Sequence, residues 1–548
     1  MSAGETIGPN RRAFLAQVGG AAAAAGVTNI FPGITTSALA HGKDDRDHDS
    51  DARRRADEAL RVRQRAAQFQ RQQELVEHRT NGDERRYANL AGSFGKALPH
   101  DGNGEIDRHA FRALVHAMST GDPADFEVIP LGGTAKLVNP QAAFAFGFIG
   151  ADTQASGLRR APAVGSAETA GEMVELYWAA LTRDVPFDQF GSNPTIAAAA
   201  ADLSSLSDFR GPKVSGVVTP DTIFRGPTAG DRIGPYISQL LWKPINYGPY
   251  VVDQRVRVAA PGVEYMTDFD ALVNILNGGA PVAQDFVGTV RRYVITGRDL
   301  AEWVHRDFTH QGGTDAVFIL LGSGVGLAAG NPYLTSATQA GFATFGAPQI
   351  LDVVAFVANL SLQACWFHKW SVHRRVRPEE YGGHVRNRLV LGRQNPVHAD
   401  LLNSAGLARV INRFGSPLLP MAYPEGCPVH PAYPAGHSSF AGAWATVLKA
   451  FFNTSAVIQN PVVPTADGSA LAPYSGPALT AGNEIDKLAS NISMGRVTSG
   501  VHWRSDCEVG MLLGERCAIM VLQDLRRSFN ESFVGFRVRK FDGTTVTI

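Results

Sequence analysis

The amino-acid sequence predicts a mainly α-helical protein with long loops and little β structure. Apolar residues recur at helical spacing through residues 230–330 and 349–388, between loops rich in glycine and proline. Few segments alternate as strands do, and residues 536–548 are the best candidate. A hydrophobic content of 44% and a charged content of 19% indicate a chain that can bury a sizeable core.

Charge and cysteine content narrow the possible functions. The 548 residues include 51 Lys+Arg and 51 Asp+Glu, so the overall charge attracts neither nucleic acid nor an anionic membrane. We therefore expect no nucleic-acid partner. The four cysteines are too few for a disulfide scaffold, and each could be a small buried apolar residue. At this point it stays open whether any disulfide forms.

Residues 1–40 are expected to be an export signal rather than part of the fold. Arg11 and Arg12 precede an apolar stretch too short to span a bilayer, and residues 38–40 form a small-x-small cleavage site. These features, in this order, resemble a twin-arginine signal, which implies a periplasmic or secreted protein. No other apolar run is expected to reach about 18 residues, so we expect no membrane anchor.

The rest of the chain is expected to form a linker and one domain. Residues 41–58 are dense in charge and should be a disordered linker. A helical pattern begins at about Ala56, and residues 59–548 should form a single domain, because neither an internal repeat nor a second domain is visible. The clearest helices are expected within residues 299–308, 350–370, 438–452 and 506–525.

The first of three polar motifs is KWSVHRRVRP, residues 369–378. It places Lys369, Arg374, Arg375 and Arg377 within ten residues without an acid. On one continuous helix Lys369 and Arg377 would lie about 80° apart and could face the same side, and Pro378 would then stop the helix. Taken alone, such a run is most often a solvated basic face.

The second motif is HPAYPAGHSSF, residues 430–440, which leads into the apolar pattern of a helix. The N–H of Gly436 can approach a ligand closely because glycine has no side chain, and Ser438 or Ser439 could cap the helix. The dipole of the helix would favour an anion there, beside His437. An ordinary capped helix with a surface histidine would have the same pattern.

The third motif is GRVTSGVHWRSD, residues 495–506. His502 and Asp506 are four residues apart, so on one helix face the carboxylate could orient the imidazole ring. Arg496 precedes Gly500 and would reach the site from a loop. Together the three motifs supply about three positive charges, a backbone N–H and two histidines, which are enough to neutralise a phosphate-like oxyanion.

In the order K…RP, P-x-GH and R-x5-H-x3-D, these motifs resemble the signature of the superfamily that joins vanadium-dependent haloperoxidases to acid phosphatases. Two details are similar to the algal-type bromoperoxidases: seven residues separate Lys369 from Arg377, and His430 lies seven residues before His437. The resemblance covers most of the chain from about Tyr87 onward. It implies a helical-bundle fold with the active site in residues 300–548.

The resemblance implies a vanadate cofactor bonded through vanadium to a ring nitrogen of His502. It implies that the vanadate oxygens are held by Lys369, Arg377, Arg496 and the N–H of Gly436. His437 would accept a proton from hydrogen peroxide, and Lys369 would polarise the bound peroxide. Halide would then attack the activated oxygen, and hypohalous acid would leave.

Two carboxylates are assigned supporting roles by the same resemblance. Asp506 would be the hydrogen-bond partner of His502. Asp307, some sixty residues before Lys369, would orient His437, although an acid on a helix surface would look the same in the sequence.

Three further residues bear on the choice of halide and on activity. Trp366 and His430 would wall the halide pocket, although a core tryptophan would look identical. His430 stands where the chloroperoxidases have phenylalanine, which favours bromide and iodide over chloride. Ala435 stands where the family has a serine, so one hydrogen bond to vanadate would be missing.

The implied partners are hydrogen peroxide, halide ions and organic halogen acceptors, and the family implies a homodimer or a larger homo-oligomer. Two other functions remain open. One is an acid phosphatase with His502 as nucleophile and His437 as general acid, which the seven-residue spacing and His430 disfavour. The other is a non-catalytic oxyanion-binding protein derived from an enzyme damaged at Ala435, which the presence of His437 disfavours.

Overall fold

The computed structural model describes residues 45–548, so the predicted export signal at residues 1–40 lies outside the described residues. Two compact units are distinguished among the described residues, residues 45–63 and 64–548. Helix α2 (Asp45–Arg71) begins inside the segment expected to be a disordered linker. That expectation is therefore wrong from Asp45 onward, because the charged residues there continue into the helical pattern that follows them.

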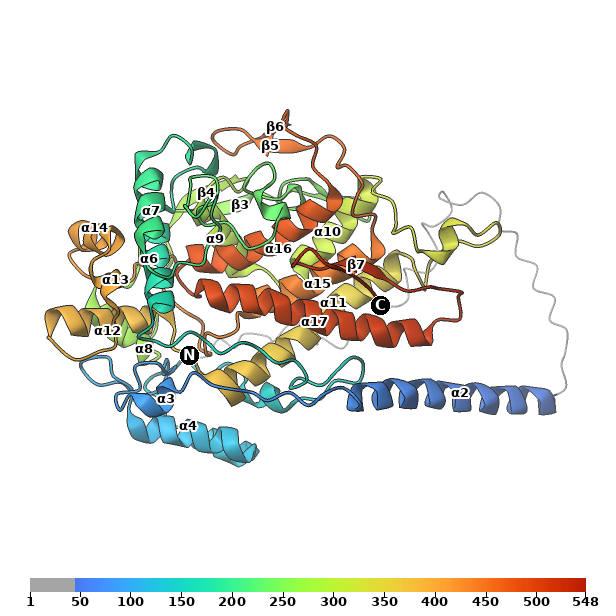
Figure 1. Ribbon diagram of the computed structural model, residues 1–548, viewed down its shortest axis with the longest axis horizontal. Coiled ribbons are helices and arrows are strands. Elements are labelled where there is room, and N and C mark those ends of the chain that lie inside the picture. The colour runs from blue at the N-terminus through green and yellow to red at the C-terminus, as the bar shows by residue number, and fades with distance from the viewer. Residues whose placement is uncertain (1–44) are drawn as a thin grey trace, which may run out of the picture. The chain divides into compact units, whose positions relative to one another are not determined.

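The larger unit is built around a bundle of four helices (Figure 1). They are α11 (Ala347–Trp366), α15 (Gly436–Phe451), α16 (Ala481–Thr498) and α17 (Arg504–Ser528). Helix α15 packs against the other three and is buried along nearly its whole length. A Cβ on Gly442 of α15 would overlap the carbonyl of Met511, and one on Gly514 of α17 would overlap the carbonyl of Ser439. Glycine at these two positions therefore lets the two backbones touch.

Helix α11 corrects one expectation about apolar runs. Together with the turn after it, Ala347–His373 is long and apolar enough by composition to cross a membrane. The expectation that no such run follows the export signal is thus wrong. In the fold this helix lies inside the bundle against α15 and α17, with Val354, Val357 and Ala358 fully buried. Its apolar character is that of a core helix.

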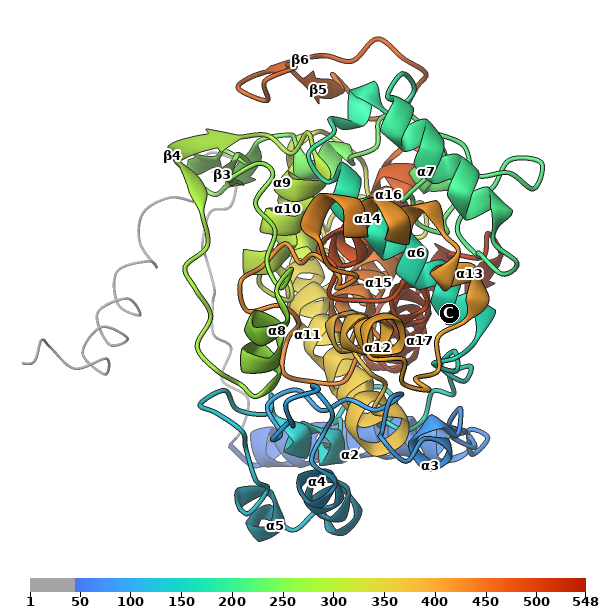
Figure 2. The same ribbon diagram turned by 90° about the vertical axis from the view of Figure 1, so that its left-hand side faces the viewer.

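Further helices surround the bundle. Figure 2 shows α6 and α7 to one side of it and the two-stranded β3–β4 sheet to the other. The longer outer helices are α4 (Arg108–Thr120), α6 (Ala167–Thr182), α7 (Pro194–Ser205), α8 (Phe269–Leu276), α9 (Gly297–Arg306), α10 (Gln311–Gly322), α12 (Pro378–Val390) and α14 (Ala405–Phe414). Three short ones are α3 (Asp83–Arg86), α5 (Pro123–Glu127) and α13 (Ala399–Leu402).

The strands of the described residues form four two-stranded antiparallel sheets, of which three are hairpins, whereas residues 260–285 with helix α8 separate β3 from β4. They are β1 (Ile245–Tyr247) with β2 (Tyr250–Val252), β3 (Val256–Ala259) with β4 (Phe286–Arg292), β5 (Val462–Pro464) with β6 (Leu471–Pro473), and β7 (Arg537–Arg539) with β8 (Thr545–Thr547). The last hairpin lies where the sequence predicts strands. The first two sheets lie in a region predicted to be helical. Strand β2 and most of β4 are exposed, so they lack the alternation that would reveal them. The prediction of a mainly helical fold is confirmed.

The chain turns sharply after α11. A π-helix, η6 (Phe367–His373), follows, and Arg374 then adopts left-handed backbone angles (φ 37°, ψ 40°). Helix α12 begins at Pro378 with Arg377 as its N-cap. Lys369 and Arg377 therefore do not share one helix, and Pro378 starts a helix instead of ending one. Proline suits the first helical position because the N–H that it lacks has no acceptor there.

Candidate active site

The first two motifs meet through backbone carbonyls. Lys369 Nζ donates to the carbonyl oxygens of Pro431 (2.6 Å) and Ala432 (2.9 Å). Arg377 Nε donates to the carbonyl oxygen of His430 (2.8 Å). Two cations from the turn after α11 thus hold the segment that leads into α15.

Arg377 also connects to the third motif and fixes the tautomer of His502. Its NH1 group lies 3.0 Å from His502 Nε2, and a guanidinium can only donate, so Nε2 carries the lone pair. His502 Nδ1 lies 2.9 Å from Asp506 Oδ2 and donates to it. Burial and the nearby charges of Arg377, Lys369 and Arg496 hold the pKa of His502 well below its usual range. The ring is therefore neutral with Nε2 available as a ligand.

Asp506 combines several contacts. His502 lies in the turn before α17 and Asp506 in its first turn, so the expectation of a shared helix face is wrong, although the predicted contact is present. Asp506 Oδ2 accepts a hydrogen bond from Trp503 N (3.0 Å) at the start of α17. Asp506 Oδ1 accepts one from Arg375 NH1 (2.8 Å), and Arg375 NH2 in turn binds Glu172 (2.9 Å). The carboxylate is fixed on both sides.

Arg496 comes from the last turn of α16 and not from a loop, which corrects the prediction. Its NH1 group donates to the carbonyl oxygen of Val304 (2.7 Å). Its guanidinium carbon lies 5.8 Å from the ring centroid of Tyr423. Arg496 Nε is buried and has no hydrogen-bond partner in the described part of the chain. One donor of this side chain is therefore left for a ligand.

The three cations lack a counter-charge. Lys369, Arg377 and Arg496 are at most 4% exposed, and none forms an ion pair with an acid among the described residues. Burial lowers the pKa of Lys369 to about 7. Uncompensated buried charges are costly, and a tetrahedral oxyanion would neutralise them. The described residues contain no cluster of three or more acidic, His or Cys side chains that could hold a metal cation. The buried positive charges and N–H donors instead fit vanadate, in which vanadium is part of an oxyanion.

His437 lies in the first turn of α15 and is the one residue of that helix that is not fully buried. Its Nε2 lies 2.8 Å from Oδ1 of Asp307, which directly follows α9. Burial lowers the pKa of His437, while the carboxylate of Asp307 opposes the shift. The ring is thus neutral and oriented at neutral pH. The structure thus brings His437 and Asp307 into contact, as the sequence analysis expected.

The start of α15 differs from the prediction in its capping. Ala435 occupies the N-cap position without a side-chain cap, while Ser438 and Ser439 lie inside the helix, so the expected serine cap is wrong. The N–H of Ala435 donates to the carbonyl oxygen of Asp506 (2.8 Å). A Cβ on Gly436 would lie 3.3 Å from the ring of Trp366. The backbone of residues 435–436 is therefore tightly enclosed.

The rings of His430 and Trp366 lie side by side, next to Lys369 and Arg377. Their ring centroids are 4.7 Å apart, and His430 Nδ1 accepts a hydrogen bond from Arg377 NH2 (2.9 Å). Lys369 Nζ lies 5.9 Å from the Trp366 ring centroid. Trp366 also packs in a buried apolar cluster, so it is both a core residue and a neighbour of the site.

Two buried ion-pair groups around the site were not assigned by the sequence analysis. One joins Glu172 of α6 through Arg375 to Asp506. The other joins Lys96 to Glu379 at 2.7 Å, and Lys96 also holds the carbonyls of the segment before His430. The sequence does contain a sign of the first group. Helix α6 carries three acids, at positions 168, 172 and 175, on one side of an otherwise apolar helix, which indicates buried basic partners.

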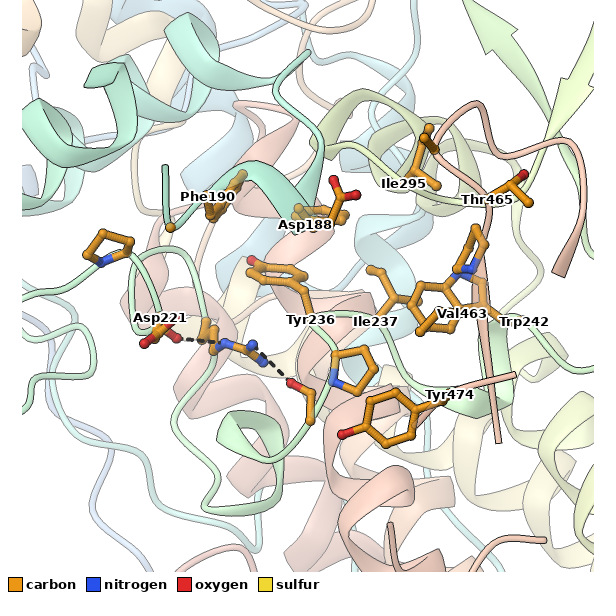
Figure 3. Close-up of a pocket in the computed structure, with 18 residues that line it drawn as sticks. Asp188, Phe190, Asp221, Tyr236, Ile237, Trp242, Ile295, Val463, Thr465 and Tyr474 are labelled. Carbon is orange, nitrogen blue, oxygen red and sulfur yellow. Dashed lines mark hydrogen bonds between the residues drawn. The ribbon is translucent and has the colours of Figure 1, made fainter. Parts of the chain in front are cut away.

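Two cavities of the described residues are not lined by these cations. A cavity of about 420 Å³ is walled by aromatic side chains, among them Tyr236, Trp242 and Tyr474, and none of the predicted site residues lines it (Figure 3). A second cavity of about 240 Å³, between the β3–β4 sheet and the end of α9, includes Asp307 in its wall. All four cysteines are buried and free, so they form no disulfide.

Comparison with known proteins shows to which family the chain belongs. The chain is 35% identical to a vanadium-dependent bromoperoxidase of Ascophyllum nodosum over 536 residues, which cover 92% of this chain and 94% of that one. It is 32% identical to one from Corallina pilulifera, with coverage of 90% and 98%. The chain belongs to the vanadium-dependent haloperoxidase family.

Two further matches agree with this membership. Residues 354–531 of this haloperoxidase match a family model described as the VCPO second helical-bundle domain. The homohexameric structure of the second vanadate-dependent bromoperoxidase from Ascophyllum nodosum superposes with a TM-score of 0.86 at 30% identity, covering 90% of each chain. The sequence-based prediction of the algal-type bromoperoxidase branch is confirmed.

Proposed function

We propose that this haloperoxidase uses vanadate and hydrogen peroxide to oxidise bromide and iodide to hypohalous acid, which halogenates organic acceptors. The observation that carries the proposal is the set of three buried cations around the lone pair of His502 Nε2, none of which forms an ion pair with an acid of residues 45–548. A phosphate-binding pocket would share the cations. The bromoperoxidase assignment adds the similarity to the algal enzymes along nine-tenths of the chain.

Lys369, Arg377, Arg496 and His502, together called the cation cage, would each contact a different part of the cofactor. His502 Nε2 is the proposed ligand of vanadium, and Asp506 keeps the proton on the opposite ring nitrogen, Nδ1. The vanadate oxygens would be held by Lys369, Arg377, Arg496 and the N–H of Gly436. When bound, vanadate supplies a Lewis-acidic centre that activates hydrogen peroxide toward halide.

His437 is the proposed general base. It is neutral at neutral pH, so it can accept a proton from hydrogen peroxide as the peroxide enters the site. The carboxylate of Asp307, at 2.8 Å, stabilises the imidazolium that results. Lys369 is fully buried beside Trp366, and its amine would polarise the peroxide as halide attacks.

The halide is proposed to approach beside His430 and Trp366. Arg377 donates to His430 Nδ1, which leaves Nε2–H of that ring as a donor at the edge of the cage. A neutral donor suits the large, weakly hydrated bromide and iodide ions. We therefore propose that chloride is a poor substrate.

Three parallel assays on purified protein test the proposal. We expect bromination of a phenolic acceptor that depends on peroxide, bromide and added vanadate. Hydrolysis of a phosphate ester without bromination would support the phosphatase alternative. Vanadate binding without either reaction would support an oxyanion-binding protein that has lost activity at Ala435.

We also propose a processing scheme and an assembly. Residues 1–40 would direct twin-arginine export to the periplasm or outside the cell, residues 41–58 would connect to the catalytic part, and residues 59–548 would form one domain. The related Ascophyllum structure is homohexameric, which supports a homo-oligomer here. Mass spectrometry of the mature N-terminus would test the cleavage, with a start near His41 as the expected result.

A further inference from the structure

The cavity of about 420 Å³ with aromatic walls is not lined by any residue of the cation cage, and we call it the aromatic cavity. Four stretches of the chain build its wall, namely residues 187–191, residues 220–242, Ile295 and residues 463–474 (Figure 3). Its volume lies within the range of roughly 300–1,000 Å³ that small-molecule sites occupy. The proposed function assigns it no ligand.

The aromatic rings of the cavity are fixed in place by the fold. The buried ring of Tyr236 stacks on that of Phe187, with centroids 4.1 Å apart and an angle of 4° between the ring planes. The hydroxyl of Tyr236 donates to the carbonyl oxygen of Phe224, and Nε1 of Trp242 donates to that of Val294 (3.0 Å). Because the polar ends of both rings are bonded within the protein, their ring carbons are left to line the cavity.

Three polar side chains of the cavity have no partner. Asp188 and Asp221 are exposed, and neither carboxylate accepts a hydrogen bond or forms an ion pair within residues 45–548. The hydroxyl of Tyr474 is also without a hydrogen-bond partner in the described chain. Figure 3 shows the three residues on different sides of Tyr236. A ligand on the aromatic wall therefore meets two free carboxylates where the cavity opens to solvent.

Of the described residues that line the cavity, Arg225 is the one with a basic side chain, and its donors are in use. Its Nε donates to the carbonyl oxygen of Asp221 (2.8 Å), NH1 to that of Asp231 and NH2 to that of Gly234 (3.4 Å). Its guanidinium carbon lies 5.0 Å from the ring centroid of Tyr236. Arg225 is thus part of the wall, and two carboxylates against one guanidinium leave the lining with a net negative charge.

We propose that the aromatic cavity binds a small organic cation with an aromatic body, of the arylalkylammonium class. The face of an aromatic ring attracts a cation that lies within about 6 Å of the ring centroid. The ammonium group would lie near Asp188 and Asp221, and the aromatic body would pack against Tyr236 and Trp242. The same carboxylates would repel an anion, and a neutral aromatic compound would leave them without a partner.

Isothermal titration calorimetry of the full chain at neutral pH tests the proposal. Phenethylammonium is the probe, and 2-phenylethanol and 3-phenylpropionate are a neutral and an anionic compound of similar size. One phenethylammonium per chain should bind, at least about tenfold more tightly than the alcohol, and the carboxylate should not bind. Equal affinity for the cation and the alcohol would overturn the proposal. No vanadate is added, so the result does not depend on whether the chain brominates.

Substitution of the two free carboxylates tests where the cation binds. Asp188→Asn/Asp221→Asn should bind phenethylammonium about as weakly as the alcohol and should leave the affinity for the alcohol unchanged. Asp270→Asn is the matched control, because Asp270 is also exposed and has no ion-pair partner in the described chain but lies on α8, outside the cavity. It should bind as the wild type does. A double variant with wild-type affinity for phenethylammonium would show that the cation binds elsewhere, and the proposal would fail.

Tyr474→Leu tests the contribution of an aromatic face. Leucine keeps apolar bulk at this partly exposed position but has no π system. Phenethylammonium should therefore bind about three- to tenfold more weakly, whereas 2-phenylethanol should lose less affinity. An equal loss for the two compounds would show that the cavity recognises only the apolar body, which would contradict the assignment of a cation.

Discussion

His502 and Asp506 are joined by a hydrogen bond of 2.9 Å between Nδ1 and Oδ2, although only Asp506 lies in helix α17. The same carboxylate accepts the N–H of Trp503, so the group that orients the imidazole also fixes the start of the helix. Its other oxygen pairs with Arg375, which is anchored by Glu172. The position of the proposed vanadium ligand is thus set by the fold over more than 300 residues of sequence.

Asp506→Asn should weaken vanadate binding about 10- to 100-fold, because the amide cannot hold His502 in the same tautomer while also accepting from Arg375. The variant should also lose about 3 kcal/mol of stability, because a buried arginine loses a charged partner. Equilibrium dialysis and urea denaturation measure the two effects. Asp467→Asn, in the exposed turn of the β5–β6 hairpin, should change neither. Unaltered vanadate affinity in Asp506→Asn would refute the role of this contact.

Vanadate affinity should depend on the protonation of Lys369. In the free site the pKa of Lys369 is about 7, and a bound oxyanion raises it. Below pH 7 the amine is charged in both states and its contribution is fully present. Above pH 7 binding requires uptake of a proton, so the affinity should fall by up to about tenfold per pH unit.

Lys369→Met isolates this effect from the titration of vanadate itself. Its affinity should be lower at pH 7, and its pH dependence should lack the part that arises from Lys369. A wild type and a variant with parallel pH profiles would contradict the assignment.

Ala435→Ser should be tolerated and should distinguish two uses of the hydroxyl. As a helix N-cap it would stabilise α15 by about 1 kcal/mol and leave vanadate affinity unchanged. Turned toward the cofactor it would tighten vanadate binding by up to roughly tenfold, which is the outcome we predict from the family serine. Thermal melting and equilibrium dialysis separate the two. If the wild type saturated with vanadate is inactive and the serine restores bromination, the chain is a lost enzyme.

Bromide and iodide should be oxidised at neutral pH, and chloride poorly. His430→Phe should shift the ratio of chloride to bromide turnover upward, because the donor at the edge of the cage is removed and Arg377 NH2 is released. Turnover with each halide at saturating peroxide and vanadate measures this. Equal rates for chloride and bromide in the wild type would exclude the proposed role of His430.

The chemistry of the site was predictable from the sequence because its residue types are few and their order is specific. Lys369, Arg377 and His502 converge as predicted, and His437 meets Asp307. The local geometry was not predictable. Helical spacing cannot reveal the π-helix and the left-handed Arg374 that carry the chain from Lys369 to Arg377.

Long-range partners were missed for a similar reason. The pairing of Glu172 with Arg375 joins residues about 200 positions apart. The acids of the apolar helix α6 indicate that a buried cation faces them, but their spacing does not identify Arg375 as that cation. The β1–β2 and β3–β4 sheets were missed because β1 and β2 have three residues each and the longer β4 is exposed along most of its length, so these strands lack an alternating pattern. Such features follow from tertiary packing and not from local preference.

The central claim is that one vanadate is held through His502, and equilibrium dialysis of the purified apo-protein against vanadate tests it most directly. The wild type should bind one vanadate per chain, His437→Ala should retain it, and His502→Ala should lose it. His502→Ala protein that binds vanadate as tightly as the wild type would contradict the account.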